Sequence, residues 1–407
     1  MKISLIQPSR NNLKYLKWSY DSIRKNQGNH EVEICIADDA STDGTWKWCL
    51  EMMGKDPLFK AHRNEGPNRL GHTILYDTLV NDVATNDICM IYHADMYLCP
   101  NALDSVEKHL KEKTIVSLTR IEPPLHPDGP EKILQDFGIE PEEFNENELL
   151  AYLQATDSER EVKVTEGIFA PWAFWKKDFQ EIGGHDEIFA PQSKEDTDIF
   201  NRFHLNGIKF IQTWEGCVYH MTCRGSRFAD GATRNPNGEV FMKNRETDEW
   251  LKQNQKSTKE FLRKWGHFCK HDALMKPIVP PKYDIGFIIK NCNDIQLLEA
   301  LEPWCSTIYV DEGKVPIIIK NYIELEQPNT SFDLNDRVKS FDNEKNNKIL
   351  ITIDSNKFNN EDFTFIQNIP EIFANDKDLE IGEFQLGNLS IKIFGLDTYE
   401  KELINNN

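Results

Sequence analysis

Several features that would place a protein in a membrane, in a secretory pathway or on nucleic acid are missing from this sequence. No apolar run approaches the roughly 18 residues that cross a bilayer. The start, Met1-Lys2-Ile3-Ser4, lacks the apolar core and cleavage site of a signal peptide. Basic residues are scarce, with 47 Lys and Arg against 67 Asp and Glu, a formal charge of −20. This balance disfavours nucleic acid and anionic membranes as partners, because both are bound through Lys and Arg.

The nine cysteines form no Cys-x-x-Cys pair and no dense framework. This usage is typical of free thiols in a reducing compartment rather than of a disulfide scaffold. We therefore predict a soluble, cytoplasmic protein without a transmembrane segment. His267-x-Cys269-x-His271 contains metal-ligand residue types but lacks a second ligand pair, so we interpret it as structural.

The length of 407 residues exceeds one ordinary hydrophobic core, so the chain is expected to form at least two domains. Prolines at 277, 280 and 281 mark a linker over residues 276–282. We predict a first domain over residues 1–275, with a helical tail near 245–270. Residues 283–407 are predicted to form a smaller α/β domain, with the strands Ile285–Ile289, Ile317–Ile319, Ile349–Ile353 and Leu389–Phe394. Three roles remain open for this domain: binding of a substrate, of a partner chain or of a second copy of the chain.

Apolar strand patterns alternate with amphipathic helix patterns in the N-terminal part of the chain. The predicted strands cover residues 2–7, 32–37 and 88–92, and helices follow each of them. Such alternation indicates an α/β domain with a mostly parallel sheet. Residues 122–160 interrupt the pattern with prolines and a short acidic helical segment, and we interpret them as an insert at the sheet edge.

Polar clusters follow three of the strands at the point where each strand ends. They are Pro8-Ser9-Arg10, Asp38-Asp39 and His93-x-Asp95. Parallel strands bring such clusters to one edge of the sheet, where α/β proteins bind ligands. His93 and Asp95 are able to ligate a divalent ion that a diphosphate also holds. The two aspartates either cap the turn, or one of them accepts a hydrogen bond from a nucleobase.

Three later stretches also carry chemistry-bearing residues. Lys194-Glu195-Asp196-Thr197-Asp198 opens a helix, where acidic residues either stabilise the helix dipole or serve as a base whose pKa the dipole lowers. The aromatic run from Gly167 to Trp175 is interpreted as core, except for Trp172, which would stack on an acceptor sugar. Arg224 and Arg227, beside Gly225, are able to close over a diphosphate.

Four motifs within about residues 1–230 together resemble those of the family 2 glycosyltransferases, which have the GT-A fold. They are Asp38-Asp39-Ala40-Ser41-Thr42-Asp43-Gly44-Thr45, His93-Ala94-Asp95, Gly183-Gly184-His185-Asp186-Glu187 followed by Glu195-Asp196, and His220 after a short strand. The resemblance implies a Rossmann-like nucleotide-diphospho-sugar transferase domain over the N-terminal part. It does not extend to residues 283–407.

The resemblance also implies roles for individual residues. Asp39 would contact uracil, Asp95 and His220 would hold Mn²⁺ or Mg²⁺, and Asp196 would be the general base, with Glu195 as its nearest competitor. Two departures from the family pattern change the site. His93 replaces the first aspartate of Asp-x-Asp and is expected to touch the ribose or the metal. The family's Ala-Arg-Asn segment is missing, so phosphate contact is assigned to Arg69. The other nucleotide-binding residues that we predict are Pro8, Arg10 and Ala94.

The leading hypothesis is an inverting glycosyltransferase that moves a sugar from a UDP-sugar to a hydroxyl of a glycan or other acceptor, as in polysaccharide biosynthesis. A nucleotidyltransferase that makes a nucleotide-sugar is the first alternative. Such enzymes usually need a glycine-rich loop after the first strand, and the corresponding loop of this chain, Gln7–Asn12, contains no glycine. The second alternative is a non-catalytic module that binds a nucleotide-sugar or a glycan, which the change to His93 suggests.

Overall fold

The chain divides into two compact units. The first comprises Met1–Gln253 and His271–Ile278 with the end of the chain, and the second comprises Asn254–Lys270 and Val279–Ile404. The sequence predicts that residues 245–270 belong to the first domain, so the two divisions differ over residues 254–270. The computed structural model describes residues 1–222, 231–243, 246–311 and 317–405.

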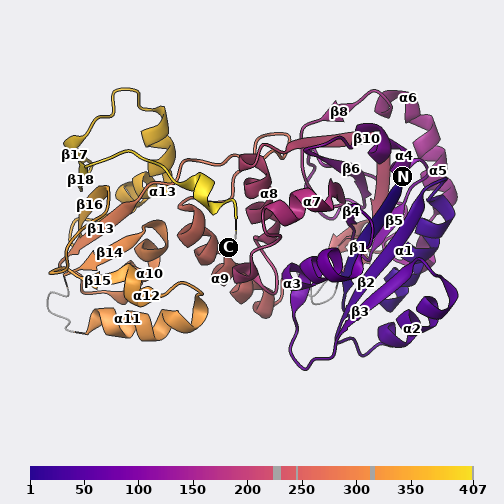
Figure 1. The fold of residues 1–407 in the computed structure, drawn as a ribbon, viewed down its shortest axis with the longest axis horizontal. Helices are drawn as coiled ribbons and strands as arrows, with labels where there is room; N and C mark the ends of the chain where they lie inside the picture. The colour runs from indigo at the N-terminus through magenta and orange to yellow at the C-terminus, as the bar shows by residue number, and fades with distance from the viewer. Residues whose placement is uncertain (223–230, 244–245, 312–316, 406–407) are drawn as a thin grey trace. The chain divides into compact units, whose positions relative to one another are not determined.

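A mixed sheet of ten strands forms the centre of the first unit (Figure 1). Eight of its strands follow the order β3-β2-β1-β4-β9-β6-β10-β5, while β7 pairs with β6 and β8 with β10. In chain order the strands are β1 (Lys2–Ser9), β2 (Glu31–Asp39), β3 (Phe59–Asn64), β4 (Ile88–Ile91), β5 (Met96–Leu98), β6 (Thr114–Glu122), β7 (Lys132–Leu134), β8 (Val164–Thr165), β9 (Trp172–Trp175) and β10 (Lys209–His220).

Helices connect the first four strands, as the alternating pattern predicts. Strand β1 pairs in parallel with β2 and β4, and β2 pairs in parallel with β3. The apolar side of the first helix is buried through residues such as Leu16 and Ile23. The helices of this unit are α1 (Leu13–Asn26), α2 (Thr45–Lys55), α3 (Gly71–Thr78), α4 (Ala102–His109), α5 (Glu146–Ala155), α6 (Asp157–Arg160), α7 (Lys176–Glu181) and α8 (Glu195–Leu205).

The pairing of β10 brings a late segment of the chain to the edge where β1, β2 and β4 end. The sequence predicts two strands near Ile208–Thr213 and Val218–His220. The structure joins them into β10, with a register shift between Thr213 and Cys217. Strand β5 pairs with β10 in the antiparallel sense, and His220 lies opposite Met96. His220 is thereby placed next to the turn that contains Asp95.

The insert after β6 packs against the sheet through Tyr219 of β10. The Tyr219 hydroxyl donates a hydrogen bond to the Gly138 carbonyl at 2.6 Å and accepts one from the Phe137 amide at 3.0 Å. A short hairpin, β11 (Ala232–Arg234) with β12 (Val240–Met242), is tied to the insert by Arg234. Its guanidinium lies 2.6 Å from Asp136. The insert and the hairpin are therefore connected by side chains far apart in sequence.

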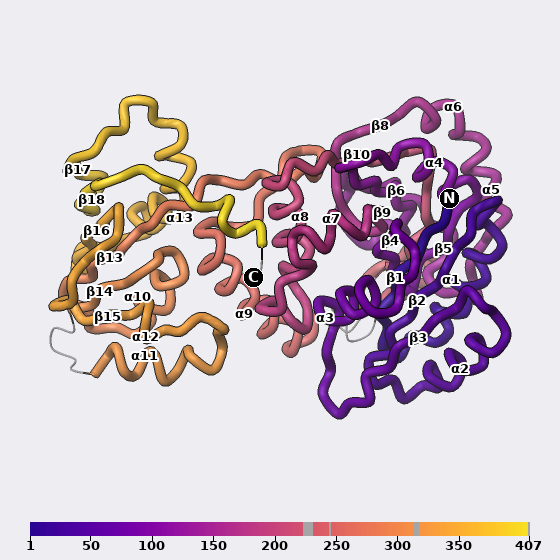
Figure 2. Tube along the Cα trace, viewed as in Figure 1, coloured from indigo at the N-terminus to yellow at the C-terminus, as the bar shows by residue number. Residues whose placement is uncertain are grey.

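The second unit has its own sheet of six strands, in the order β15-β14-β13-β16-β18-β17. The orange and yellow parts of the trace in Figure 2 form this sheet and its helices. Its strands are β13 (Ile285–Lys290), β14 (Thr307–Val310), β15 (Val338–Ser340), β16 (Ile349–Asp354), β17 (Gly382–Leu386) and β18 (Leu389–Ile393). Its helices are the end of α9 (Asp248–Trp265), α10 (Ile295–Leu301), α11 (Ile318–Glu326), α12 (Leu334–Arg337) and α13 (Asn360–Asn375).

Three of the four strands predicted for this region are confirmed as β13, β16 and β18. The fourth, Ile317–Ile319, is wrong, because helix α11 begins at Ile318. A run of three isoleucines fits a buried helix face as well as a strand, and its length does not separate the two. Within the described residues, none of the helices combines the length and the apolar character needed to cross a membrane.

Candidate active site

A pocket of about 240 Å³ lies at the carboxyl edge of the first sheet. Its wall is built from the end of β1, helix α3, the turn between β4 and β5, the start of α8 and the end of β10. The residues that line it are Pro8, Asn12, His72, Tyr76, His93, Ala94, Asp95, Glu195, Asp196 and His220. The structure thus brings together most of the site residues that the sequence predicts.

His93, Asp95 and His220 form a group whose ligand atoms all lie within 4.8 Å of one another. The Nε2 atom of His220 is 3.3 Å from Oδ1 of Asp95. The centroids of the two imidazole rings are 5.5 Å apart. Two imidazole nitrogens and one carboxylate oxygen fit Mn²⁺ better than Mg²⁺, which prefers oxygen ligands.

The electrostatics of this group suit a cation. Burial lowers the pKa of His93 to about 3, so its imidazole is neutral and has a free lone pair. Burial also acts to lower the pKa of His220, but the carboxylates of Asp95 and Glu122 outweigh it and raise the pKa to about 9. Burial acts to raise the pKa of Asp95, yet His220 keeps it at about 2. A divalent ion would take the place of the His220 proton beside an ionised carboxylate.

Sequence reasoning missed the second partner of His220. The Nδ1 atom of His220 is 2.7 Å from Oε1 of Glu122, a buried residue at the end of β6. Glu122 is in turn paired with Arg120, whose Nε lies 3.1 Å away, and with Lys132. Glu122 ends a strand at the same edge as the other clusters, which is the signal that could have identified it.

Glu195 and Asp196 lie at the start of α8 and face the same pocket. Glu195 is 7% exposed, and its burial together with the charge of Asp196 raises its pKa to about 8. Loss of hydration also raises the pKa of Asp196, while the charges of His185 and Arg120 act to lower it. The predicted lowering of the pKa by the helix dipole is wrong, because the loss of hydration outweighs the dipole.

A buried histidine beside this pair was also missed. The Nδ1 atom of His185 is 2.6 Å from Oδ1 of Asp77, and its ring stacks on Tyr76 with the centroids 5.5 Å apart. A Cβ atom on Gly184 would lie 2.0 Å from Asp77, so glycine is required for this contact. Charge on His185 opposes the rise in the pKa of Asp196.

The raised pKa of Glu195 predicts a pH-dependent change in stability. Unfolded, Glu195 ionises near its ordinary pKa of 4.5, whereas the folded protein keeps this proton up to about pH 8. Between these values the unfolded state binds fewer protons, so the free energy of unfolding falls as the pH rises. Glutamine cannot ionise, so we expect Glu195→Gln to raise the free energy of unfolding by about 2 kcal/mol at pH 8.

Thermal unfolding at pH 5 and pH 8 measures this difference. The gain in Tm of Glu195→Gln should be several degrees at pH 8 and close to zero at pH 5. The matched control is Glu159→Gln, which changes an exposed glutamate and should alter Tm equally at both pH values. An equal change at both pH values for Glu195→Gln would show that Glu195 is not a buried, protonated side chain.

Asp39 anchors the loop that leads into α3. Its Oδ1 accepts hydrogen bonds from the Asn64 side chain at 2.7 Å and the Leu70 amide at 3.0 Å, and its Oδ2 accepts one from the Gly71 amide at 3.0 Å. Asp38 is fully buried, and its Oδ2 accepts no hydrogen bond from the described residues. The contact of Asp39 with uracil remains a prediction, to which the structure adds this anchoring role.

Gly71 is the most constrained position in this loop. Its φ is +80°, and an added Cβ would lie 2.1 Å from the Pro191 carbonyl oxygen. We expect Gly71→Ala to lower the free energy of unfolding by about 3 kcal/mol, because left-handed strain and overpacking add. Gly54→Ala is the matched control. It lies in α2 with nothing within 4 Å of the added Cβ, and should stabilise the protein slightly. Equal urea midpoints for the two variants would contradict the close packing of Gly71.

Two of the four arginines predicted to bind the nucleotide lie within the described residues. Arg69 lies with its Nε 3.7 Å from Asp39 and donates a hydrogen bond to the Gln192 side chain at 2.8 Å. Burial lowers the pKa of Arg69, and the charge of the exposed Arg10 lowers it further, while Asp39 acts to raise it. Arg224 and Arg227 lie outside the described residues. Phosphate contact by Arg69, Arg224 and Arg227, and nucleotide binding by Arg10, remain predictions.

Trp172 is not available for stacking on a sugar, and this prediction is wrong. The residue is 0% exposed in β9, between β4 and β6. Its ring contacts Phe174, Phe200 and Phe203, with centroids 4.6 to 5.8 Å apart. Burial of a large aromatic side chain in the core outweighs its use at the surface. Residues 167–174 are buried, and Trp175 is partly exposed.

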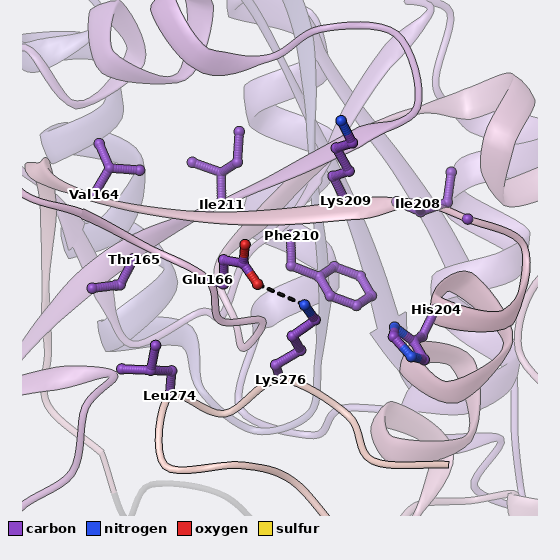
Figure 3. A pocket seen from close by; sticks show the side chains of 11 residues that line it. Val164, Thr165, Glu166, His204, Ile208, Lys209, Phe210, Ile211, Leu274 and Lys276 are labelled. Atoms are coloured by element: carbon purple, nitrogen blue, oxygen red, sulfur yellow. Dashed lines mark hydrogen bonds and ion pairs between the residues drawn. The ribbon is translucent and has the colours of Figure 1, made fainter.

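A second, larger pocket of about 870 Å³ lies at the other end of β10. Figure 3 shows its lining, with Phe210 and His204 near the start of β10 and an ion pair between Glu166 and Lys276 at 2.6 Å. Its side chains supply one carboxylate, already paired with a cation, and one imidazole. The smaller pocket, with three carboxylates and three imidazoles, is therefore the better candidate for catalysis.

The fold is α/β, and the pocket lies at the carboxyl edge of its sheet, where proteins of this class bind ligands. Residues 4–183 match the family model described as Glycosyl transferase family 2. The matched part is therefore similar to glycosyl transferase family 2, and the first unit has the GT-A fold. This similarity supports a role in glycosyl transfer. A search of curated proteins finds no sequence match.

The solved structures that match this chain include three with low sequence identity. S. aureus TarS 1–349 matches with 15% identity and a TM-score of 0.40, over 54% of this chain and 60% of that chain. GalNAc-T7 with UDP, GalNAc and Mn²⁺ matches with 15% identity and a TM-score of 0.41, over 54% and 43%. The mannosyltransferase PcManGT from Pyrobaculum calidifontis, in complex with GDP-Man and Mn²⁺, matches with 16% identity and a TM-score of 0.43, over 82% and 77%. The match spans less than two thirds of the first two chains.

Proposed function

We propose that this protein is an inverting, metal-assisted glycosyltransferase that uses a UDP-sugar and an acceptor hydroxyl. The observation that carries this proposal is that the candidate metal ligands and the candidate bases line the same pocket. The ligand group of His93, Asp95 and His220 lines it together with the carboxylates of Glu195 and Asp196. A metal group and a base that open on one pocket are what displacement of a diphosphate from a sugar requires.

His93, Asp95 and His220 would hold the metal, which supplies a Lewis acid for the charge that develops on the leaving diphosphate. Asp95 is the one carboxylate among these ligands, so it contributes the negative charge that binds the cation. The two histidines would add neutral nitrogen ligands. Arg224 and Arg227 are proposed to support the same leaving-group charge.

Asp196 would act as the general base. It accepts the proton of the acceptor hydroxyl while that oxygen forms a bond to the anomeric carbon. The bond between this carbon and the diphosphate oxygen breaks on the opposite face, so the configuration inverts. A raised pKa makes Asp196 a better proton acceptor than an ordinary aspartate, provided that it is ionised. The neutral Glu195 beside it leaves Asp196 as the charged member of the pair at neutral pH.

The proposal is tested with a panel of UDP-, GDP-, ADP- and CMP-sugars, each with and without Mn²⁺. A ligand that binds only the folded state raises Tm. We expect the largest rise, and release of the free nucleoside diphosphate, with one UDP-sugar in the presence of Mn²⁺. Pyrophosphate release from a nucleoside triphosphate and a sugar phosphate would instead favour a nucleotidyltransferase. No binding and no turnover with any donor would contradict both enzymatic functions.

A further inference from the structure

A buried carboxylate outside the pocket contacts one of the candidate metal ligands. Glu122 is 2% exposed, and its Oε1 lies 2.7 Å from Nδ1 of His220. We propose that Glu122 is a positioning residue that fixes the His220 ring so that Nε2 faces a metal held with Asp95 and His93. This inference rests on the proposed function, because it concerns the metal of the same site.

The hydrogen bond determines which ring nitrogen of His220 is available. An ionised carboxylate only accepts hydrogen bonds, so Nδ1 of His220 must carry the donated hydrogen. The other nitrogen, Nε2, then points toward Asp95, whose Oδ1 is 3.3 Å away. Metal-bound histidines commonly use such a carboxylate on the second nitrogen to fix the tautomer and the ring orientation.

The sheet itself brings the two side chains together. Strands β6 and β10 are parallel neighbours, with Arg120 opposite Val218 and Ile121 opposite Tyr219. The same register continued by one residue brings Glu122 alongside His220. Both residues end their strands at the edge where the pocket lies. Glu122 is therefore placed by backbone pairing rather than by a mobile loop.

Two cations hold Glu122 in place. The Nε atom of Arg120 is 3.1 Å from Oε1 of Glu122, and the Nζ atom of Lys132 is 3.7 Å from Oε2. A second carboxylate, Glu131, pairs with the same cations at 3.2 and 3.4 Å but has no contact with His220 among the described residues. Glu131 therefore serves as a matched control that shares the ion-pair network and lacks the contact with the ligand.

The experiment measures Mn²⁺ affinity by calorimetry, with no sugar donor present. We expect Glu122→Ala to weaken Mn²⁺ binding about 100-fold, and Glu122→Gln, which retains an acceptor oxygen, about 10-fold. Glu131→Gln should stay within twofold of the wild type. His220→Ala provides the reference for loss of the ligand itself. Far-UV circular dichroism and Tm establish that each variant is folded.

A second measurement tests whether Glu122 positions the His220 ring or only stabilises the fold. With Zn²⁺ as a diamagnetic probe, NMR of ¹⁵N-histidine-labelled protein should show a slowly exchanging proton on Nδ1 of His220, retained in Glu131→Gln and lost in Glu122→Ala. Wild-type Mn²⁺ affinity in folded Glu122→Ala, or equal losses in the Glu122→Gln and Glu131→Gln variants, would overturn the inference. So would the absence of Mn²⁺ binding by the wild type. The glycosyl-transfer proposal is scored separately, by turnover of the donor panel.

Discussion

Asp196→Asn is expected to lower kcat for sugar transfer about 10³-fold, while the affinity for the donor changes less than twofold. Asparagine occupies the same space but cannot take the proton of the acceptor hydroxyl, and one positioned base contributes roughly 10²–10⁴-fold. The wild type should also lose activity as the pH falls, at a higher pH than an ordinary aspartate would give, because the pKa of Asp196 is raised. Initial rates at saturating donor and acceptor between pH 5 and pH 9 measure both effects.

Glu195→Gln is the comparison that assigns the base to one member of the pair. Glu195 lines the same pocket, and its pKa of about 8 leaves it neutral at pH 7. We therefore expect this variant to retain transfer activity within about tenfold of the wild type. If Asp196→Asn kept near-wild-type transfer with normal donor binding, while Glu195→Gln lost it, the base would be Glu195.

Asp95→Asn is expected to have the second large effect, through the metal. It removes the only carboxylate of the group formed with His93 and His220. A neutral amide binds a divalent cation poorly, so we expect Mn²⁺ affinity to fall at least about 10²-fold and transfer about 10³-fold. The measurement is Mn²⁺ titration followed by electron paramagnetic resonance, together with donor turnover at several Mn²⁺ concentrations.

Asp104→Asn provides the control for this variant. Asp104 also lies beside a histidine, with its Oδ1 2.9 Å from Nε2 of His30, and it belongs to a second group of ligand-type residues. None of the residues of this group lines the pocket. Asp104→Asn should leave Mn²⁺ stoichiometry and turnover unchanged. Equal losses in both variants would mean that the metal acts elsewhere on the chain.

The sequence predicts which edge of the sheet carries the site, because each strand and the polar residues after it are recognised from neighbouring residues alone. The apolar strands that precede Pro8, Asp39 and His93 read clearly from the sequence, and parallel pairing puts their ends together. The resemblance to a family then adds Asp196 and His220, which the structure brings into the same pocket as His93 and Asp95. Backbone pairing positions His220 and the turn that carries His93 and Asp95, whereas Asp196 lies at the start of α8.

The remaining parts of the site depend on side-chain contacts between distant segments. Glu122 and His220 are 98 residues apart, and Asp77 and His185 are 108 apart. No local period encodes such pairs. Burial is equally non-local. Trp172 is in the core because Phe200 and Phe203 of α8 pack against its ring, and Glu195 holds its proton because burial removes its water. The sequence thus shows which chemical groups are present, but it does not show how exposed each side chain is to water.

The most direct test of this account is an anomalous difference map of crystals grown with UDP and Mn²⁺. We predict one manganese peak within bonding distance of Asp95 and His220, with diphosphate oxygens on the same ion and Asp196 across the pocket. A peak at His30 and Asp104 instead, or a diphosphate bound in the pocket with no metal beside Asp95, would contradict the account.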